Sequence, residues 1–233
     1  MALDQAILEA TSTGSFEGRP TRPTLRFYGW SEPTLSLGYF QSHQTVSAAH
    51  ASLCKVRRST GGGAILHDHE LTYSLTIPTG EPFRVSRQDL YLAMHEAIVT
   101  ALGEFGISAR PFRESGGVAG VDDAYLCFQR RTDEDLLISG YKVVGSAQRR
   151  ARSALLQHGS ILLRASESAP QIPGIFELTS QLLPIDRLSR RIADSIGAWL
   201  DVDWIGGEVD SEEKNRANEL QIRFDSSGWW LRR

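Results

Sequence analysis

The sequence predicts an α+β fold in which one domain occupies residues 1–233. Segments with the apolar periodicity of helices alternate along the chain with short segments rich in β-branched and aromatic residues. No repeat, low-complexity tract or linker separates them. Hydrophobic residues make up 41% of the sequence and charged residues 23%, which is typical of globular proteins and unlike disordered or membrane proteins. These observations favour a β-sheet flanked by helices.

The first part of the chain begins with a helix and continues with strands. Residues 2–11 carry apolar side chains at helical spacing, and the glycines and prolines that follow end this helix in a loop. Alternating apolar residues then predict a pair of strands within residues 24–37. Residues 55–58 form another short strand, and residues 64–76 resume the strand pattern after three successive glycines.

The rest of the chain contains the clearest helix, at residues 86–103, where apolar residues repeat at helical spacing up to a glycine. A strand, a turn and a second strand are expected between residues 126 and 144. Residues 155–163 predict a further strand, and residues 185–200 a second long helix.

Charge and cysteine content limit the classes of function. The net charge of −3 disfavours nucleic-acid binding, which needs a broad basic surface. No segment approaches the roughly 20 apolar residues that span a membrane, and the first ten residues lack the basic start of a signal peptide. Cys54 and Cys127 are too few for a disulfide framework. We therefore expect a cytoplasmic protein with reduced thiols that binds neither nucleic acid nor a membrane.

The densest chemical signal is the segment 57–68, Arg-Arg-Ser-Thr-Gly-Gly-Gly-Ala-Ile-Leu-His-Asp. Glycines let the backbone approach a ligand closely, and the arginines can pair with an anion, so this loop can hold an acyl-phosphate or an acyl carbonyl. A flexible hairpin turn is the alternative interpretation. His67 and residues 68–70 also suggest metal ligands, but no third ligand stands at a recognisable spacing, so we predict no metal site.

Two further segments carry groups suited to acyl transfer. A cysteine thiolate attacks a thioester at little thermodynamic cost, and a nearby ammonium favours the thiolate and binds a developing oxyanion. Cys127 is the candidate nucleophile and Lys142 the candidate ammonium. The simpler interpretation is that Cys127 is a buried packing residue and that Lys142 is a solvated surface residue. His158, at the start of an apolar strand, either orients a neighbour or only satisfies its own hydrogen bonds.

Taken in order, these segments resemble the catalytic domain of the lipoate–protein ligase and octanoyltransferase family. The resemblance rests on the motif at 57–68, on Glu-Leu-Thr-Tyr-Ser at 70–74, on Lys142 followed by Gly-Ser-Ala-Gln-Arg at 145–149, and on Leu-Gln-His-Gly-Ser at 156–160. The two ends of the chain also resemble family termini, so the resemblance covers nearly the whole sequence.

The resemblance implies an α+β fold shared with the biotin protein ligase catalytic domain, with a mixed β-sheet flanked by helices. It implies catalytic roles for Cys127 and Lys142, with the lysine contacting the acyl carbonyl or the activated group. It also implies an acyl pocket, whose substrate-binding residues are expected to be Arg58, Thr60, Gly61, Gly62, Gly63, His67, Gly145, Ser146, Ala147, His158 and Gly159.

Two activities occur in this family, and Cys127 favours one of them. One branch of octanoyltransferases places its nucleophile in a Cys-Phe pair upstream of the lysine motif, as Cys127 and Phe128 stand here. Such an enzyme takes an octanoyl group from acyl carrier protein through a cysteine thioester and needs no cofactor. Its acceptor is a lysine of a lipoyl domain or of glycine cleavage H protein. We also expect no C-terminal accessory domain, which many ATP-using ligases carry.

Two alternatives remain open from the sequence. The first is a lipoate or octanoate–protein ligase that uses ATP and Mg²⁺ and in which Cys127 only packs. The second is a non-catalytic relative that binds an acylated carrier. The charged segment 129–135 is expected at the rim of the pocket, either facing an acidic carrier or as a solvated turn.

Overall fold

The computed structural model of the chain describes residues 1–13, 22–115 and 125–232. The loop predicted after the first helix lies mostly outside these residues. Across the described ranges, no helix is both long enough and apolar enough to cross a membrane.

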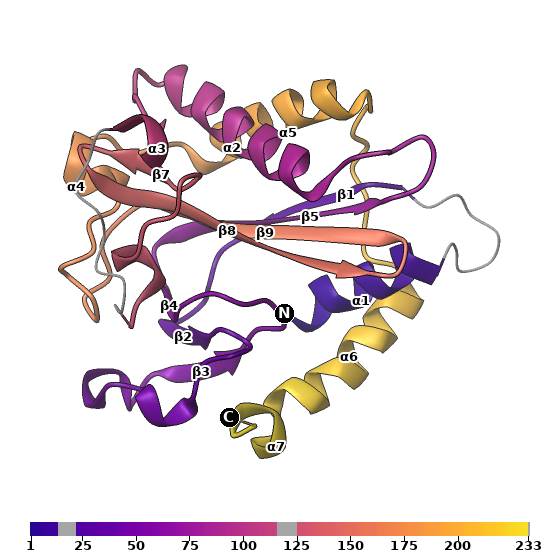
Figure 1. Ribbon diagram of the computed structural model, residues 1–233, viewed down its shortest axis with the longest axis horizontal. Helices are drawn as coiled ribbons and strands as arrows, with labels where there is room; N and C mark the ends of the chain where they lie inside the picture. The colour runs from indigo at the N-terminus through magenta and orange to yellow at the C-terminus, as the bar shows by residue number, and fades with distance from the viewer. Residues whose placement is uncertain (14–21, 116–124, 233) are drawn as a thin grey trace.

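A large antiparallel sheet forms the centre of the molecule (Figure 1). Its strand order is β1-β5-β9-β8-β7-β6, and every neighbouring pair is antiparallel. All residues of β5 and β9 are buried, because other elements cover both faces of the sheet. The strands are β1 (Thr24–Tyr28), β5 (Glu70–Pro78), β6 (Arg110–Pro111), β7 (Leu136–Ile138), β8 (Tyr141–Ala151) and β9 (Ala154–Leu162).

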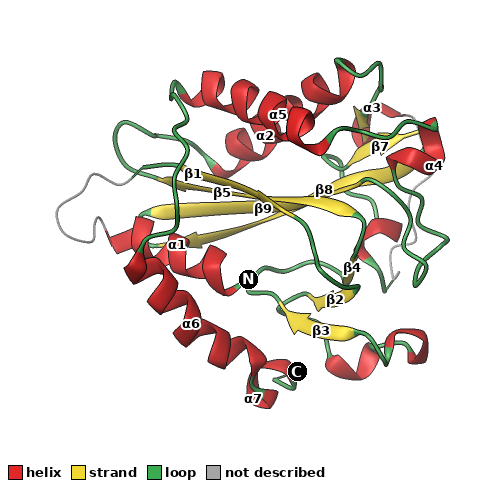
Figure 2. Cartoon of the chain, turned by 180° about the vertical axis from the view of Figure 1, so that it is seen from behind, coloured by secondary structure: helices red, strands yellow, loops and turns green. Residues whose placement is uncertain are grey.

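A small three-stranded sheet lies below one face of the large one (Figures 1 and 2). Its central strand β2 (Thr34–Leu37) pairs in parallel with β3 (Cys54–Arg57) and antiparallel with β4 (Ile65–His67). The mixed pairing that the sequence predicted therefore lies in this small sheet. Two short 3₁₀ helices, His43–Thr45 and Ala48–His50, join β2 to β3.

Helices cover both faces of the large sheet (Figure 2). On one face, α2 (Arg87–Gly103) packs against α5 (Ile185–Leu200), and their buried side chains join those of β5 and β9 in the main core. On the other face, α1 (Ala2–Thr13) contacts β5 and β9, and α6 (Ser211–Asp225) packs along its outer side. The remaining helices are short: α3 (Phe112–Ser115), α4 (Ile175–Thr179) and α7 (Ser227–Trp230).

Most predicted elements are present, and the differences have physical reasons. The strand predicted at 64–76 is divided, because Asp68 and His69 turn the chain between β4 and β5. The strand, turn and strand predicted between 126 and 144 are present as β7 and β8, but they begin later, because residues Cys127–Gln129 form a 3₁₀ turn. The sequence also left α6 unpredicted, since Leu220 is its only buried residue among those described and its apolar pattern is weak. Its capping box, Asp210 with Glu213, was the available signal.

Candidate active site

The glycine loop between β3 and β4 is shaped by a buried arginine. Nη2 of Arg58 donates to the carbonyl oxygens of Gly61 and Gly63 at 2.8 and 2.6 Å, and Nη1 donates to that of Ser36 at 2.9 Å. Burial lowers the pKa of Arg58 to about 10. No carboxylate of the described residues lies in ion-pair contact with it, so backbone carbonyls hold the guanidinium. The sequence predicted that this arginine pairs with an anion. In the structure its guanidinium donates to backbone carbonyls and so fixes the shape of the loop.

Glycine is favoured at two points of this loop. Gly62 has a φ of +96°, which side chains rarely tolerate. A Cβ on Gly63 would lie 3.2 Å from both the Cα and the N of Cys127, so glycine permits the loop to pack closely on the cysteine segment. The backbone N–H of Cys127 donates to the carbonyl of Ala64 at 2.7 Å. The glycine loop and the cysteine, more than sixty residues apart in sequence, are thus joined directly.

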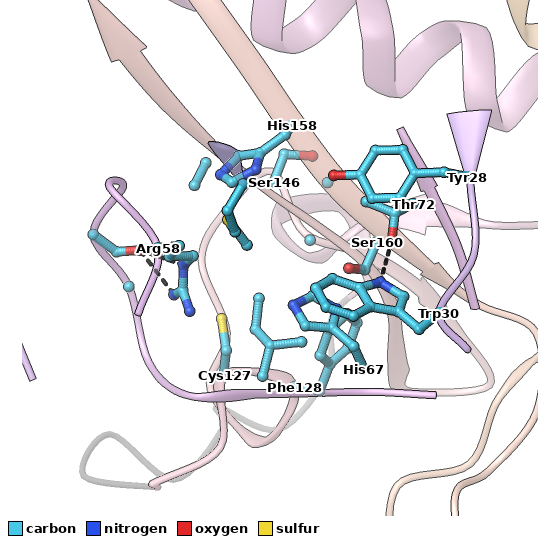
Figure 3. A pocket seen from close by; sticks show the side chains of 17 residues that line it. Tyr28, Trp30, Arg58, His67, Thr72, Cys127, Phe128, Ser146, His158 and Ser160 are labelled. Carbon is cyan, nitrogen blue, oxygen red and sulfur yellow. Dashed lines mark hydrogen bonds between the residues drawn. The ribbon is translucent and has the colours of Figure 1, made fainter. Parts of the chain in front are cut away.

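Cys127 lies at the wall of a pocket (Figure 3), and the side chain of Lys142 contacts this cysteine. Nζ of Lys142 lies 3.7 Å from Sγ of Cys127 and 3.4 Å from its carbonyl oxygen. The cysteine is partly exposed, whereas the lysine is only 3% exposed. The lysine nitrogen also lies 5.4 Å from the ring centre of Phe128. A thiol and a buried amine in contact can carry out nucleophilic chemistry on an acyl group.

Asp135 is the charged partner of the lysine, and the sequence interpretation missed it. Its Oδ2 lies 2.8 Å from Nζ of Lys142, and both side chains are buried. The same oxygen accepts the backbone N–H of Thr132 at 2.7 Å. Asp135 had been placed at the pocket rim or in a solvated turn, together with the rest of the charged segment. That expectation is wrong for Asp135, because an ion pair compensates its burial.

The remaining predicted residues come from the strands β4, β8 and β9 and from the glycine loop. Thr60 and His158 form a hydrogen bond between Oγ1 and Nε2 of 2.7 Å, and burial lowers the pKa of His158 to about 4. A Cβ on Gly145 would lie 2.6 Å from Cε of Lys142, so this glycine leaves room for the lysine side chain. The pocket encloses about 500 Å³, including space open to solvent. Of the predicted residues, those that line it are Arg58, Gly61, Gly62, His67, Cys127, Gly145, Ser146, Ala147, His158 and Gly159. Thr60, Gly63 and Lys142 do not line it, but each lies next to a lining residue, His158 or Cys127.

His67 belongs to a polar cluster beneath Trp30. The two rings stack with their centres 4.1 Å apart (Figure 3). Nδ1 of His67 lies 2.8 Å from Oε1 of Glu70, and the hydroxyls of Thr72 and Ser160 donate to the same oxygen. Within the described ranges no group of three or more acidic, histidine or cysteine side chains is arranged to hold a metal ion, so these residues form hydrogen bonds to one another instead.

A second network, missed by the sequence interpretation, lies behind the pocket. Nδ1 of His95 donates to the carbonyl of Glu134 at 2.6 Å, so its Nε2 accepts the hydroxyl of Ser146, also at 2.6 Å. Tyr73 donates to that serine, and Gln157 donates to Tyr73 at 3.1 Å. Burial lowers the pKa of His95 to about 4, which keeps the imidazole neutral. This network fixes the backbone next to the lysine's acidic partner.

Comparison with known proteins places these features in a family. The model of the lipoyl protein ligase A/B catalytic domain matches residues 1–172. Octanoyltransferase LipM of Kyrpidia tusciae is 31% identical, over 100% of this chain and 94% of that protein. Octanoyltransferase LipM of Moorella thermoacetica is 32% identical, over 100% of this chain and 93% of that protein.

Solved structures agree with the sequence comparisons on the fold. A lipoate-protein ligase A bound with ATP matches with a TM-score of 0.74 at 22% identity, over 99% of this chain and 93% of that one. A bipartite lipoate protein ligase from Thermoplasma acidophilum matches with a TM-score of 0.74 at 20% identity, over 99% of this chain and 91% of that one. The predicted α+β fold is therefore confirmed, and the chain belongs to the lipoyl protein ligase A/B catalytic domain family.

Proposed function

We propose that this chain is an octanoyltransferase of lipoate biosynthesis in which Cys127 is the nucleophile. The names of its full-length relatives support the activity. The observation that carries the role of the cysteine is the distance of 3.7 Å between its Sγ and Nζ of Lys142, at the wall of a pocket. Since the relatives are enzymes by name, a non-catalytic binding role is not supported.

The first half-reaction loads the enzyme. The thiolate of Cys127 attacks the carbonyl carbon of octanoyl-acyl carrier protein, the bond from that carbon to the carrier sulfur breaks, and the carrier leaves as a thiol after taking up a proton. The ammonium of Lys142 stabilises the negative charge, which lies first on the sulfur and then on the carbonyl oxygen. Apolar side chains of Trp30, Ile65 and Phe128 line the pocket and suit an octanoyl chain.

The second half-reaction transfers the octanoyl group to a lysine of a lipoyl domain or of glycine cleavage H protein. The lysine amine attacks the thioester carbonyl, and Cys127 leaves. Because the thioester already supplies the activated acyl group, the proposed reaction consumes no ATP. An amide is more stable than a thioester, so the transfer is favourable.

Mass spectrometry of the intact protein tests this proposal. The purified chain is incubated with octanoyl-acyl carrier protein without ATP, and an octanoyl adduct that hydroxylamine removes is expected. Cys127→Ala should lose the adduct. Cys54→Ala is the matched control, since Cys54 is exposed and does not line the pocket, and it should keep the adduct.

The competing ligase activity gives a different result. If lipoyl-domain modification requires ATP, Mg²⁺ and free octanoate or lipoate, and Cys127→Ala does not slow it, the transferase proposal is wrong. If octanoyl-acyl carrier protein modifies the acceptor without ATP and only the Cys127 variant fails, the ligase alternative is wrong.

A further inference from the structure

The proposed function leaves one polar atom of the pocket without a role. Nε2 of His67 is buried and has no hydrogen-bond partner among the described residues. The imidazole lines the same pocket as Cys127, and Figure 3 shows both side chains among those around it. A buried ring nitrogen without a partner is costly, so its retention in an acyl pocket suggests that it binds a group of the substrate.

The hydrogen bonds around Glu70 determine which nitrogen of His67 carries a proton. Trp30 donates to Oγ1 of Thr72 at 2.9 Å, so the Thr72 hydroxyl is free to donate to Glu70. Burial by itself raises the pKa of Glu70, but the nearby His67 and the hydroxyls of Thr72 and Ser160 more than offset this and lower it. Glu70 is therefore a carboxylate that only accepts.

His67 consequently donates through Nδ1, so whenever the ring holds a single proton the lone pair is on Nε2. The carboxylate stabilises the imidazolium that forms when Nε2 takes a proton. Stacking on Trp30 with an angle of 8° between the ring planes holds the imidazole in one orientation. The pair has the arrangement of a carboxylate-supported general base.

The other basic groups at the pocket are already occupied. Lys142 donates to Asp135 at 2.8 Å and contacts Cys127, so it acts as a cation. Nε2 of His158 forms a hydrogen bond of 2.7 Å with Thr60. Among the described side-chain nitrogens of the residues that line this pocket, Nε2 of His67 is the one that is buried without a hydrogen-bond partner.

We propose that His67, supported by Glu70, is the catalytic base that deprotonates the acceptor lysine in the second half-reaction. This inference rests on the proposed function. A lysine arrives as an ammonium and cannot attack until it loses a proton. One proton passes to Nε2 of His67 and then to solvent, and the amine nitrogen bonds to the acyl carbon. The C–S bond breaks, and the proton lost as the amide forms goes to the departing sulfur of Cys127.

The test compares two amines on the octanoyl-Cys127 form of the full-length enzyme. A lipoyl-domain lysine needs a base, whereas hydroxylamine is largely unprotonated at neutral pH and does not. For His67→Gln, we expect the ratio of the lysine rate to the hydroxylamine rate to fall about 100-fold or more relative to wild type. His69→Gln is the matched control, because His69 is a neighbouring histidine whose side chain is 53% exposed, and it should keep the ratio.

Glu70→Gln is a second variant, in which a neutral amide replaces the carboxylate that partners Nδ1 of His67. It should lower the ratio of the lysine rate to the hydroxylamine rate, but by less than His67→Gln does. If His67→Gln does not accumulate octanoyl-Cys127, the ratio in Glu70→Gln decides. Equal falls in both rates would mean that His67 only shapes the pocket, and unchanged rates would mean that another base acts; either result overturns the inference. Failure of the wild-type enzyme to form octanoyl-Cys127 would instead reject the proposed function.

Discussion

Replacing Asp135 with asparagine tests the buried ion pair that orients Lys142. The two side chains are 2% and 3% exposed, and their charged atoms lie 2.8 Å apart. Removing one partner of such a pair costs about 3 to 5 kcal/mol, because the other charge stays buried and unpaired. Asparagine can still accept the N–H of Thr132, and the lysine keeps its contact with the carbonyl of Cys127, so the lower end applies.

We therefore expect Asp135→Asn to lower the free energy of unfolding by about 3 kcal/mol. For a domain of this size, that loss corresponds to a fall in Tm of about 6 to 12 °C. Urea unfolding and thermal scans measure it, and formation of octanoyl-Cys127 should slow because the ammonium is no longer fixed.

A double-mutant cycle with Lys142→Met separates the pair from other effects of each substitution. Once the lysine charge is absent, replacing Asp135 with asparagine should cost at least about 1 kcal/mol less than it does in the wild-type protein. A Tm change below about 2 °C, together with additive effects of the two substitutions, would refute this account of the pair.

Two further predictions concern residues that adjoin the site. In Gly145→Ala, the new Cβ would lie 2.6 Å from Cε and 3.0 Å from Nζ of Lys142, so the lysine must move and acylation of Cys127 should fall about 100-fold. Mass spectrometry follows the adduct, and Gly80→Ala, where a Cβ meets nothing within 4 Å, should leave it unchanged. His95 has a pKa of about 4 in the folded chain against an ordinary 6.5, so on acidification the unfolded chain binds the proton first and stability falls between these two pH values. The loss from this group should approach about 3 kcal/mol, and urea unfolding of His95→Gln should show a flatter pH profile; parallel profiles would contradict the assignment.

The fold was largely predictable because its main elements have strong local patterns. The helix 86–103 matches α2 closely, since its apolar residues repeat regularly and Ser86 caps its first turn by accepting the N–H of Asp89. By contrast, α6 buries little and depends on contacts with α1, so its apolar pattern is weak. Pairing between strands distant in sequence, such as β5 with β9, also has no local signal.

The candidate site was predictable where its residues belong to contiguous motifs. The glycine loop and the Gly145–Ala147 segment could be found in this way, because each needs glycine next to a specific neighbour. Asp135 and His95 could not, because one looked like part of a solvated charged segment and the other like one polar residue of a helix. Their roles depend on contacts across the sheet, to Lys142 and Ser146, that only the folded chain brings about.

The face of strand β8 on which the Lys142 side chain lies is the clearest example of a site feature that depends on contacts between strands. In a regular strand, residues three apart point to opposite faces, which would separate Lys142 from Gly145. Strand β8 instead contains an irregularity opposite β7, where Leu136 pairs with Val144 but Leu137 pairs with Lys142. The extra residue lets two consecutive valines enter the core and turns the lysine to the pocket face, beside Gly145. The approach of this amine to the sulfur of Cys127 therefore depends on how β8 pairs with β7, and a lysine in the same sequence motif without that bulge would face α2.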